Sequence, residues 1–211
     1  MDPENASSSG NRIRQVRVLL WALVAVTIAG VAVLMSLPKA PNDTPTLVEN
    51  SGGPGIGGPF TLVGGDGKPF ASSRLAGKPY AIYFGFTRCG DVCPTTLGRL
   101  VKLRGEAGGE SALNIMFVTI DPTHDGPKEV GQYAALFNSP IIGLTGTQAQ
   151  IDHIKKQYKI FAEPSPHPMA GKEMEHTASV LLFDRGGNFV STIDSQEPDS
   201  TAVAKLKRLT V

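Results

Sequence analysis

The chain contains two cysteines, Cys89 and Cys93, in the stretch YFGFTRCGDVCP, where an apolar run ends and a proline follows the second cysteine. A thiolate attacks disulfides and binds soft metal ions, so a closely spaced pair suits redox chemistry, metal binding or both. An inert disulfide staple is the competing interpretation, but closing so short a loop would constrain the unfolded chain little. The pair therefore indicates chemistry.

A metal bound by two thiolates needs further ligands, and the chain offers four histidines. His153 lies among lysines on an expected helix face, and His167 lies between two prolines in an expected loop. His124, in DPTHDGP after an apolar run, is interpreted as a turn residue. His176 follows a polar loop at the mouth of the expected strand 180–183, and from its position alone both a structural role and a ligand role remain open.

Three further polar or sulfur-bearing residues stand near these positions. Met169 and Met174 precede His176 and offer transient thioether ligands, although flexible loop contacts are the simpler interpretation. Asp91, between the cysteines, either tunes their thiolates or is a solvated turn residue.

The elements that position the cysteines follow from the apolar pattern of residues 60–211. Apolar runs predict strands at 80–86, 115–120 and 141–144, and Gly-rich turns predict hairpins within 60–70 and around 184–187. Helical spacing predicts helices at 95–104, 130–137, around 151–158 and at 200–209. Strands separated by helices and closed by a hairpin predict an α/β fold, a central sheet flanked by helices.

The cysteine pair falls between an expected strand and an expected helix. Pro94 has a fixed φ suited to the first helical position, so Cys93 is expected near the N-cap, where unpaired amides favour its thiolate. Strand, thiol and helix in this order is the thioredoxin arrangement, but thioredoxins place two residues between their cysteines and this chain places three. The wider loop is able to close a disulfide and also lets both sulfurs meet on one metal ion.

The N-terminal region predicts a membrane anchor. Residues 18–37 carry no charge and as a helix would span roughly 30 Å, the thickness of a bilayer core, whereas a cleaved signal peptide would have a shorter apolar run. Arg12, Arg14 and Arg17 precede this run and place residues 1–17 in the cytoplasm. We expect a single-pass inner-membrane protein whose Pro/Gly-rich linker, 38–59, tethers a soluble domain, 60–211, in the periplasm or its organellar equivalent.

The charge balance excludes one class of partner. The 211 residues include 20 basic and 19 acidic side chains, with a formal net charge of +1. A nucleic-acid-binding domain needs a strongly basic surface to neutralise phosphates, so no nucleic-acid partner is expected.

Behind a single expected N-terminal anchor, the chain contains three motifs in this order: GFTRCGDVCPTT, IDPTHDGP and EHTASVLLFD. With these motifs it resembles the Sco/SenC family of membrane-tethered, thioredoxin-like copper proteins that serve cytochrome c oxidase assembly. The resemblance covers about residues 55–211. It implies that Cys89 and Cys93 bind copper, as Cu(I) or Cu(II), through their sulfurs, and that His176 completes the site through a ring nitrogen. It also implies that the protein receives copper from a donor protein and delivers it to the binuclear copper site of oxidase subunit II, or keeps the cysteines of that site reduced.

The sequence departs from the family pattern at two positions. Gly90 stands where the family usually has proline, which is expected to loosen the cysteine loop. His124 stands where the family usually has arginine, which puts a partner-docking role of its loop in doubt.

Three functions compete. A copper chaperone needs His176, whereas a thiol-disulfide oxidoreductase, in which one thiolate attacks and the other resolves, does not. The two activities are able to coexist, because the pair must be reduced before copper binds. A peroxide-reducing enzyme would need a dedicated pocket for its reactive cysteine, and no sequence sign of one is present.

Overall fold

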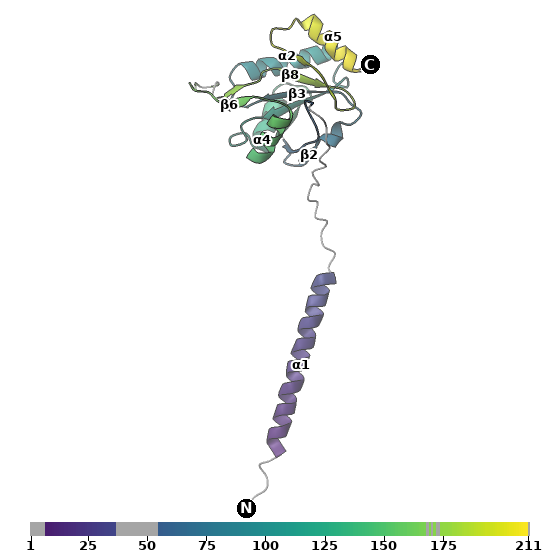
Figure 1. Cartoon of the computed structure of the whole chain (residues 1–211), viewed down its shortest axis with the longest axis vertical. Helices are drawn as coiled ribbons and strands as arrows, with labels where there is room; N and C mark the ends of the chain where they lie inside the picture. The colour runs from purple at the N-terminus through teal and green to yellow at the C-terminus, as the bar shows by residue number, and fades with distance from the viewer. Residues whose placement is uncertain (1–6, 37–54, 168, 170, 172–173, 211) are drawn as a thin grey trace, which may run out of the picture. The chain divides into compact units, whose positions relative to one another are not determined.

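The structure is a computed structural model that describes residues 7–36, 55–167, 169, 171 and 174–210. The chain divides into two units, Met1–Leu47 and Val48–Val211 (Figure 1). The expected linker 38–59 lies outside the described residues as far as residue 54, and so do the first six residues of the expected N-terminal tail.

The first unit contains one long helix, α1 Ser7–Ser36. It includes most of the uncharged run from which the membrane anchor is predicted, and the large apolar side chains described in residues 14–29, Leu19 and Trp21 among them, are exposed. Among the residues whose side chains the structure describes, no helix is long and apolar enough to cross a membrane. The anchor at 18–37 stays a prediction.

The second unit is built on a seven-stranded sheet of order β2-β1-β5-β4-β3-β8-β9. The central strands β3, β4 and β5 run parallel, and the strands that flank them pair antiparallel. Every residue of β3 is buried, because helices cover both faces of the sheet there. The strands are β1 Thr61–Gly64, β2 Pro69–Ala71, β3 Tyr80–Gly85, β4 Asn114–Thr119, β5 Ile142–Thr145, β8 Val180–Phe183 and β9 Phe189–Ile193.

Helices flank this sheet on both sides, with α2 and α5 on one side and α4 on the other (Figure 1). Buried leucines at positions 97, 100 and 103 form the apolar stripe of α2, as their spacing predicts. The helices are α2 Val92–Glu106, α3 Pro127–Ala135, α4 Gln148–Gln157 and α5 Asp199–Thr210, with a short 3-10 turn, η1 Ser72–Leu75, after β2. The predicted α/β architecture, a central sheet flanked by helices, is confirmed.

Two local predictions at the site need correction. Helix α2 begins at Val92 with Asp91 at the N-cap, so Cys93 is the second helical residue and Pro94 the third. The proline is tolerated there because amides of the first helical turn have no intrahelical partner to lose. His176 lies at the end of a separate strand, β7 Met174–His176, which pairs with β6 Ala162–Pro164 in a two-stranded sheet that the sequence analysis did not predict.

Candidate metal centre

The two cysteines lie in the connection from β3 to α2 and in the first turn of α2, and both side chains are buried. Cys89 is in the connecting loop, 9% exposed, and Cys93 is fully enclosed in the first turn of the helix. Neither is in a disulfide. The Cys93 amide donates to the sulfur of Cys89 over 3.3 Å, so Cys89 takes up one of the unpaired amides at the helix N-terminus.

This arrangement shifts the pKa values of the two thiols in opposite directions. Hydrogen bonding from the Cys93 thiol, helped by the backbone amides of Cys93 and Asp91, lowers the pKa of Cys89 to about 4 against the opposing effect of burial. The pKa of Cys93 is raised, because its thiol donates to the charged Cys89 and because it is buried. The helix start was predicted to favour a thiolate at Cys93, whereas its amide points at the sulfur of Cys89 and the directions of both pKa shifts favour the thiolate at Cys89.

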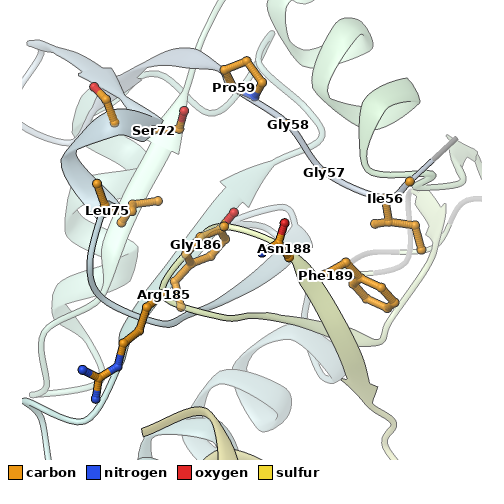
Figure 2. A pocket seen from close by; sticks show the side chains of 15 residues that line it. Ile56, Gly57, Gly58, Pro59, Ser72, Leu75, Arg185, Gly186, Asn188 and Phe189 are labelled. Carbon is orange, nitrogen blue, oxygen red and sulfur yellow. The ribbon is translucent and has the colours of Figure 1, made fainter. Parts of the chain in front are cut away.

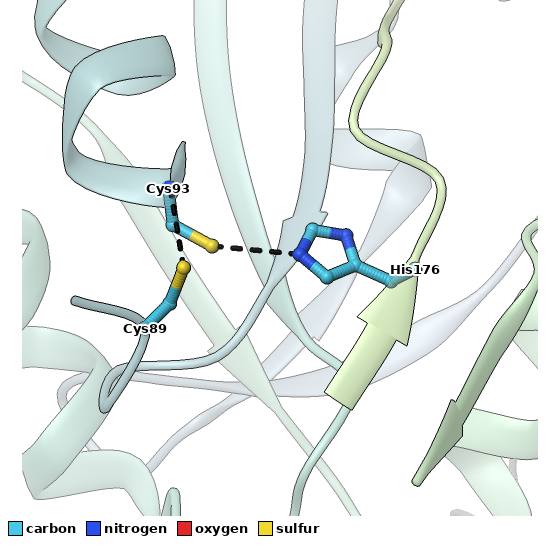
Figure 3. A group of neighbouring side chains, drawn as sticks. All are labelled: Cys89, Cys93 and His176. Atoms are coloured by element: carbon cyan, nitrogen blue, oxygen red, sulfur yellow. Dashed lines mark hydrogen bonds between the residues drawn. The ribbon is translucent and has the colours of Figure 1, made fainter. Parts of the chain in front are cut away.

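His176 faces the cysteines from strand β7, as Figure 3 shows. Its Nε2 atom lies 3.6 Å from the sulfur of Cys93, and its Nδ1 atom lies 3.0 Å from the carbonyl oxygen of Thr177. A carbonyl oxygen only accepts hydrogen bonds, so Nδ1 carries the proton in this arrangement. In the neutral ring Nε2 then presents its lone pair toward the sulfurs, which is the tautomer that a metal ligand requires.

The ligand atoms of Cys89, Cys93 and His176 all lie within 4.8 Å of one another. Two atoms that each bind one ion at about 2.0–2.3 Å are at most about 4.6 Å apart, so small side-chain movements suffice for all three to meet on one ion. Among the described residues, no fourth cysteine, histidine or carboxylate joins this cluster. The three residues singled out in the sequence are thus brought together, and their role as ligands stays a prediction.

The walls of the site are apolar and close-fitting. The rings of Tyr83 and Phe86 meet the His176 ring edge-on, with centroids 6.1 and 6.0 Å away. At Gly85 there is no room for a side chain, because a Cβ atom would lie 2.9 Å from the sulfur of Cys93. Glycine at this position lets the second sulfur pack directly against the end of β3.

Asp125 holds the start of the cysteine loop by hydrogen bonds, a role that the sequence analysis missed. Its side chain is fully buried, and its carboxylate accepts hydrogen bonds from the amide and hydroxyl of Thr87 and from the hydroxyl of Thr119 at 2.5–2.9 Å. The hydroxyl of Thr145 donates to its backbone oxygen. These threonines stand at the ends of three neighbouring strands, and that pattern of a threonine after or at the end of each apolar run was the signal available in the sequence.

The remaining histidines lie away from the cluster. His124 is in a turn, as predicted, and its Nδ1 atom lies 2.9 Å from the carboxylate of Asp121. Arg88 contacts the same carboxylate at 2.7 Å. Although burial alone would raise it, the pKa of Asp121 is held at about 2 by hydrogen bonds from Thr123, His124 and Arg88. His153 and His167 are exposed, as expected for a solvated helix face and a loop.

Three other candidates fall at the margins of the site. Asp91 is exposed at the N-cap of α2, and its side chain makes no capping hydrogen bond. Met169 is 62% exposed, whereas Met174 is half-buried and packs against the core from strand β7. Neither methionine belongs to the three-residue cluster, and their role as transient ligands stays a prediction.

A pocket of about 960 Å³ lies at the other end of β3, next to Tyr80 (Figure 2). Its described lining contains no cysteine or histidine, so it offers no soft metal ligands. It is lined by residues 55–59, Ser72, Ser73, Leu75, Ala76, Tyr80 and residues 185–189.

Comparison with known proteins matches the SCO1/SenC family over residues 48–211. The chain is similar to the mitochondrial protein SCO2 of Saccharomyces cerevisiae, 33% identical over 156 residues that cover 72% of this chain and 52% of that protein. It therefore spans about half the length of the first curated relatives it matches.

Solved structures of this kind share the fold. The copper-bound structure of Bradyrhizobium japonicum ScoI is 36% identical with a TM-score of 0.65, and the match covers 73% of this chain and 99% of that one. BsSco, described as a member of the Sco family of cytochrome c oxidase assembly proteins, is 22% identical with a TM-score of 0.60, covering 74% and 94%. The predicted thioredoxin-like architecture, a central sheet flanked by helices, is confirmed by this likeness.

Proposed function

We propose a function from one premise: the chain belongs to the SCO1/SenC family. It is a copper-binding metallochaperone for cytochrome c oxidase assembly, and Cys89, Cys93 and His176 are its copper ligands. The single observation that carries the proposal is that two sulfurs and an imidazole nitrogen lie within 4.8 Å of one another. The copper-bound ScoI structure supports the choice of metal.

The donor set favours copper over zinc. Two sulfurs and one imidazole are soft, low-coordinate ligands of the kind that select Cu(I), whereas a structural zinc site is almost always closed by four ligands. Because the cluster contains three such ligands among the described residues, an incoming protein ligand has room to approach the ion. Cys89 and the half-buried His176 are the members that an acceptor meets first, since Cys93 is fully enclosed.

The ligand assignment is tested by titrating the reduced full chain, in detergent, with Cu(I) against a competing chelator without oxygen. We expect one ion per chain, and His176→Ala should lower the affinity for Cu(I) by more than about tenfold. The loss for Cu(II) should be larger, because the harder ion depends more on nitrogen. His153→Ala, on an exposed helix face, is the control and should change neither affinity. Lower thermal stability of His176→Ala with unchanged copper affinity would show that the histidine is structural.

Delivery of the ion to the binuclear copper site of oxidase subunit II, after loading by an upstream donor protein, is the second part of the proposal. Its support is the family membership and the three-residue ligand set, which leaves a coordination position for a ligand of the acceptor. The copper-loaded chain is mixed with metal-free subunit II, the two are separated, and copper in each is measured. Reduction of disulfide-bonded subunit II by the copper-free reduced chain, whose own cysteines become a disulfide, together with no copper transfer from the loaded chain, would instead favour maintenance of those cysteines.

Thiol-disulfide exchange is the alternative function, and one observation favours it. With a pKa near 4, the Cys89 thiol is ionised at neutral pH and able to attack a partner disulfide, after which Cys93 attacks the mixed disulfide and releases the reduced partner. This chemistry has no need of His176. A His176→Ala variant that loses copper binding but keeps full reductase activity toward its physiological acceptor would assign the main role to redox chemistry.

We also propose that residues 18–37 anchor the chain in the inner membrane, with the second unit on the periplasmic side or its organellar equivalent. The support is the uncharged run, the three arginines before it, and apolar side chains on α1 such as Trp21, which is 73% exposed. Protease added to intact spheroplasts should digest the second unit. Its survival there, or recovery of a freely soluble mature protein, would contradict the anchor.

A further inference from the structure

The hairpin that carries His176 also contacts the loop between the two cysteines. The amide of Gly90, the residue after Cys89, donates a hydrogen bond to the carbonyl oxygen of Gly171 over 3.2 Å. Gly171 lies in the connection between β6 and β7, ahead of the strand that ends at His176. The cysteine loop and the histidine hairpin are therefore joined by backbone as well as by side chains.

This contact requires glycine at position 171, because the two backbones lie very close together. A Cβ atom on Gly171 would lie 2.8 Å from the nitrogen and 2.9 Å from the Cα atom of Gly90, and the φ of +79° at Gly171 is one that L side chains rarely adopt. Position 90, in contrast, has room for a Cβ atom. A Cβ atom on Gly90 would lie 3.5 Å from the Cα atom of Gly171, an ordinary van der Waals contact.

The contact lies at the connection between β6 and β7, at the end of the hairpin away from Thr177. At the opposite end, the amide of Thr177 donates to the carbonyl oxygen of Phe161 over 3.0 Å, and the amide of Phe161 donates to the Thr177 hydroxyl over 3.1 Å. These two bonds continue the pairing within the hairpin, whereas the Gly90–Gly171 bond and the packing of His176 against Tyr83 and Phe86 join the hairpin to the rest of the domain.

We propose that the hydrogen bond from Gly90 to Gly171 is a positioning contact that holds the β6–β7 hairpin, and with it His176, against the cysteine loop. The inference rests on the proposed function, because its consequence is that this contact slows the release of Cu(I). A backbone hydrogen bond of ordinary net strength changes the balance between a docked and an undocked hairpin by about three- to tenfold. The Cu(I) dissociation rate should change by the same factor when the bond is removed.

Two substitutions at Gly90 separate the hydrogen bond from the side chain. Gly90→Pro removes the N–H group, whereas Gly90→Ala keeps it and adds a methyl group that the structure accommodates. The full chain is loaded with Cu(I) without oxygen, and transfer to an excess of a Cu(I) chelator is followed over time. We expect release about three- to tenfold faster from Gly90→Pro and within twofold of the parent chain from Gly90→Ala. Equal rates for all three chains overturn the proposal.

A second pair of variants covers the case in which Gly90→Pro does not fold. Gly171→Ala forces the two backbones apart, and its control is Gly187→Ala, where φ is +80° and nothing lies within 4 Å of the added Cβ atom. Both carry the same backbone strain, so only Gly171→Ala should release Cu(I) faster, and equal release from the two overturns the proposal.

Amide hydrogen exchange of the metal-free chain gives a readout that does not involve copper. The Gly90 amide, which donates to Gly171, should exchange about three- to tenfold faster in Gly171→Ala than in Gly187→Ala, and equal exchange counts against the proposal. A parent chain that binds no Cu(I) would instead refute the proposed function, while the exchange result would still test the contact.

Discussion

Adding one methyl group at Gly85 should weaken copper binding although no ligand is changed. In Gly85→Ala the new Cβ atom would lie 2.9 Å from the sulfur of Cys93, 3.1 Å from Cε1 of Tyr83 and 3.2 Å from Cε2 of Phe117. Ordinary contacts begin at 3.4 Å, so the sulfur must retreat by about 0.5 Å, the difference between 3.4 and 2.9 Å. The two rings cannot make room on the other side, because both are fully buried.

The displacement is large compared with what a metal site tolerates. Metal–ligand distances hold to about 0.2 Å, and overpacking of this kind costs about 1–3 kcal/mol in a well-packed interior. If about 1.4 kcal/mol of that strain opposes the metal-bound geometry, Cu(I) affinity falls by about tenfold. We expect the metal-free variant to lose about 1–3 kcal/mol of unfolding free energy and the copper-bound form to lose more.

The assay compares urea unfolding of the reduced chain with and without Cu(I), together with a competitive Cu(I) titration. Gly98→Ala is the control, since Gly98 is an exposed residue of α2 with nothing within 4 Å of an added Cβ atom. It should stabilise the chain by about 0.5–1 kcal/mol and leave copper affinity unchanged. A Gly85→Ala chain that is destabilised but binds Cu(I) as tightly as the parent would refute the reasoning that the sulfur position limits affinity.

Four further predictions follow from the same site. Alkylation of the reduced chain at pH 6, read by peptide mass spectrometry, should modify Cys89 and not Cys93. The alkylation rate should fall only as the pH drops through about 4, because the depressed pKa keeps the Cys89 thiolate present above that value. Cu(I) binding at pH 7 should release about one proton per ion, measured by calorimetry in buffers of different ionisation enthalpy, since only Cys93 still has a thiol proton to lose. The chain oxidised to a Cys89–Cys93 disulfide should bind no copper, and undiminished affinity in that form would overturn the ligand assignment. Asp125→Asn should cost about 1–3 kcal/mol of unfolding free energy and lower copper affinity, because it replaces a buried carboxylate that accepts three hydrogen bonds under the cysteine loop.

The central sheet could be predicted from the sequence because its strands are buried on both faces. Residues 80–85 and 115–118 form uninterrupted apolar runs, and such runs indicate parallel strands covered by helices. Helix boundaries were less certain, since they depend on a single turn. Pro94 suggested a helix start one residue later than Cys93, yet the structure continues the helix back to Val92.

The β6–β7 hairpin could not be predicted. Its strands have three residues each, Pro164 ends one of them, and Glu163 faces Glu175 across the pair. Such strands have neither apolar alternation nor a favourable cross-strand pair to reveal them. The hairpin is held instead by contacts distant in sequence, among them the one between Gly90 and Gly171. The departure at Gly90 was expected to loosen the cysteine loop, whereas the structure gives its amide a partner that a proline could not bind.

The division of charge between the two thiols shows most clearly where sequence reasoning ends. In the sequence Cys93 is the cysteine nearer the helix, and proximity to the helix dipole favours it as the thiolate. A thiolate is stabilised, however, by amides that point at its sulfur, and a side chain inside the first turn does not lie in front of those amides. Cys89 does, since its sulfur accepts the Cys93 amide from outside the helix. Cys93, enclosed beneath it, then keeps its proton until a metal ion replaces that proton. In the copper site that we propose, the residue best placed to meet an incoming ion is therefore already charged, and the buried residue completes the site once the ion has arrived.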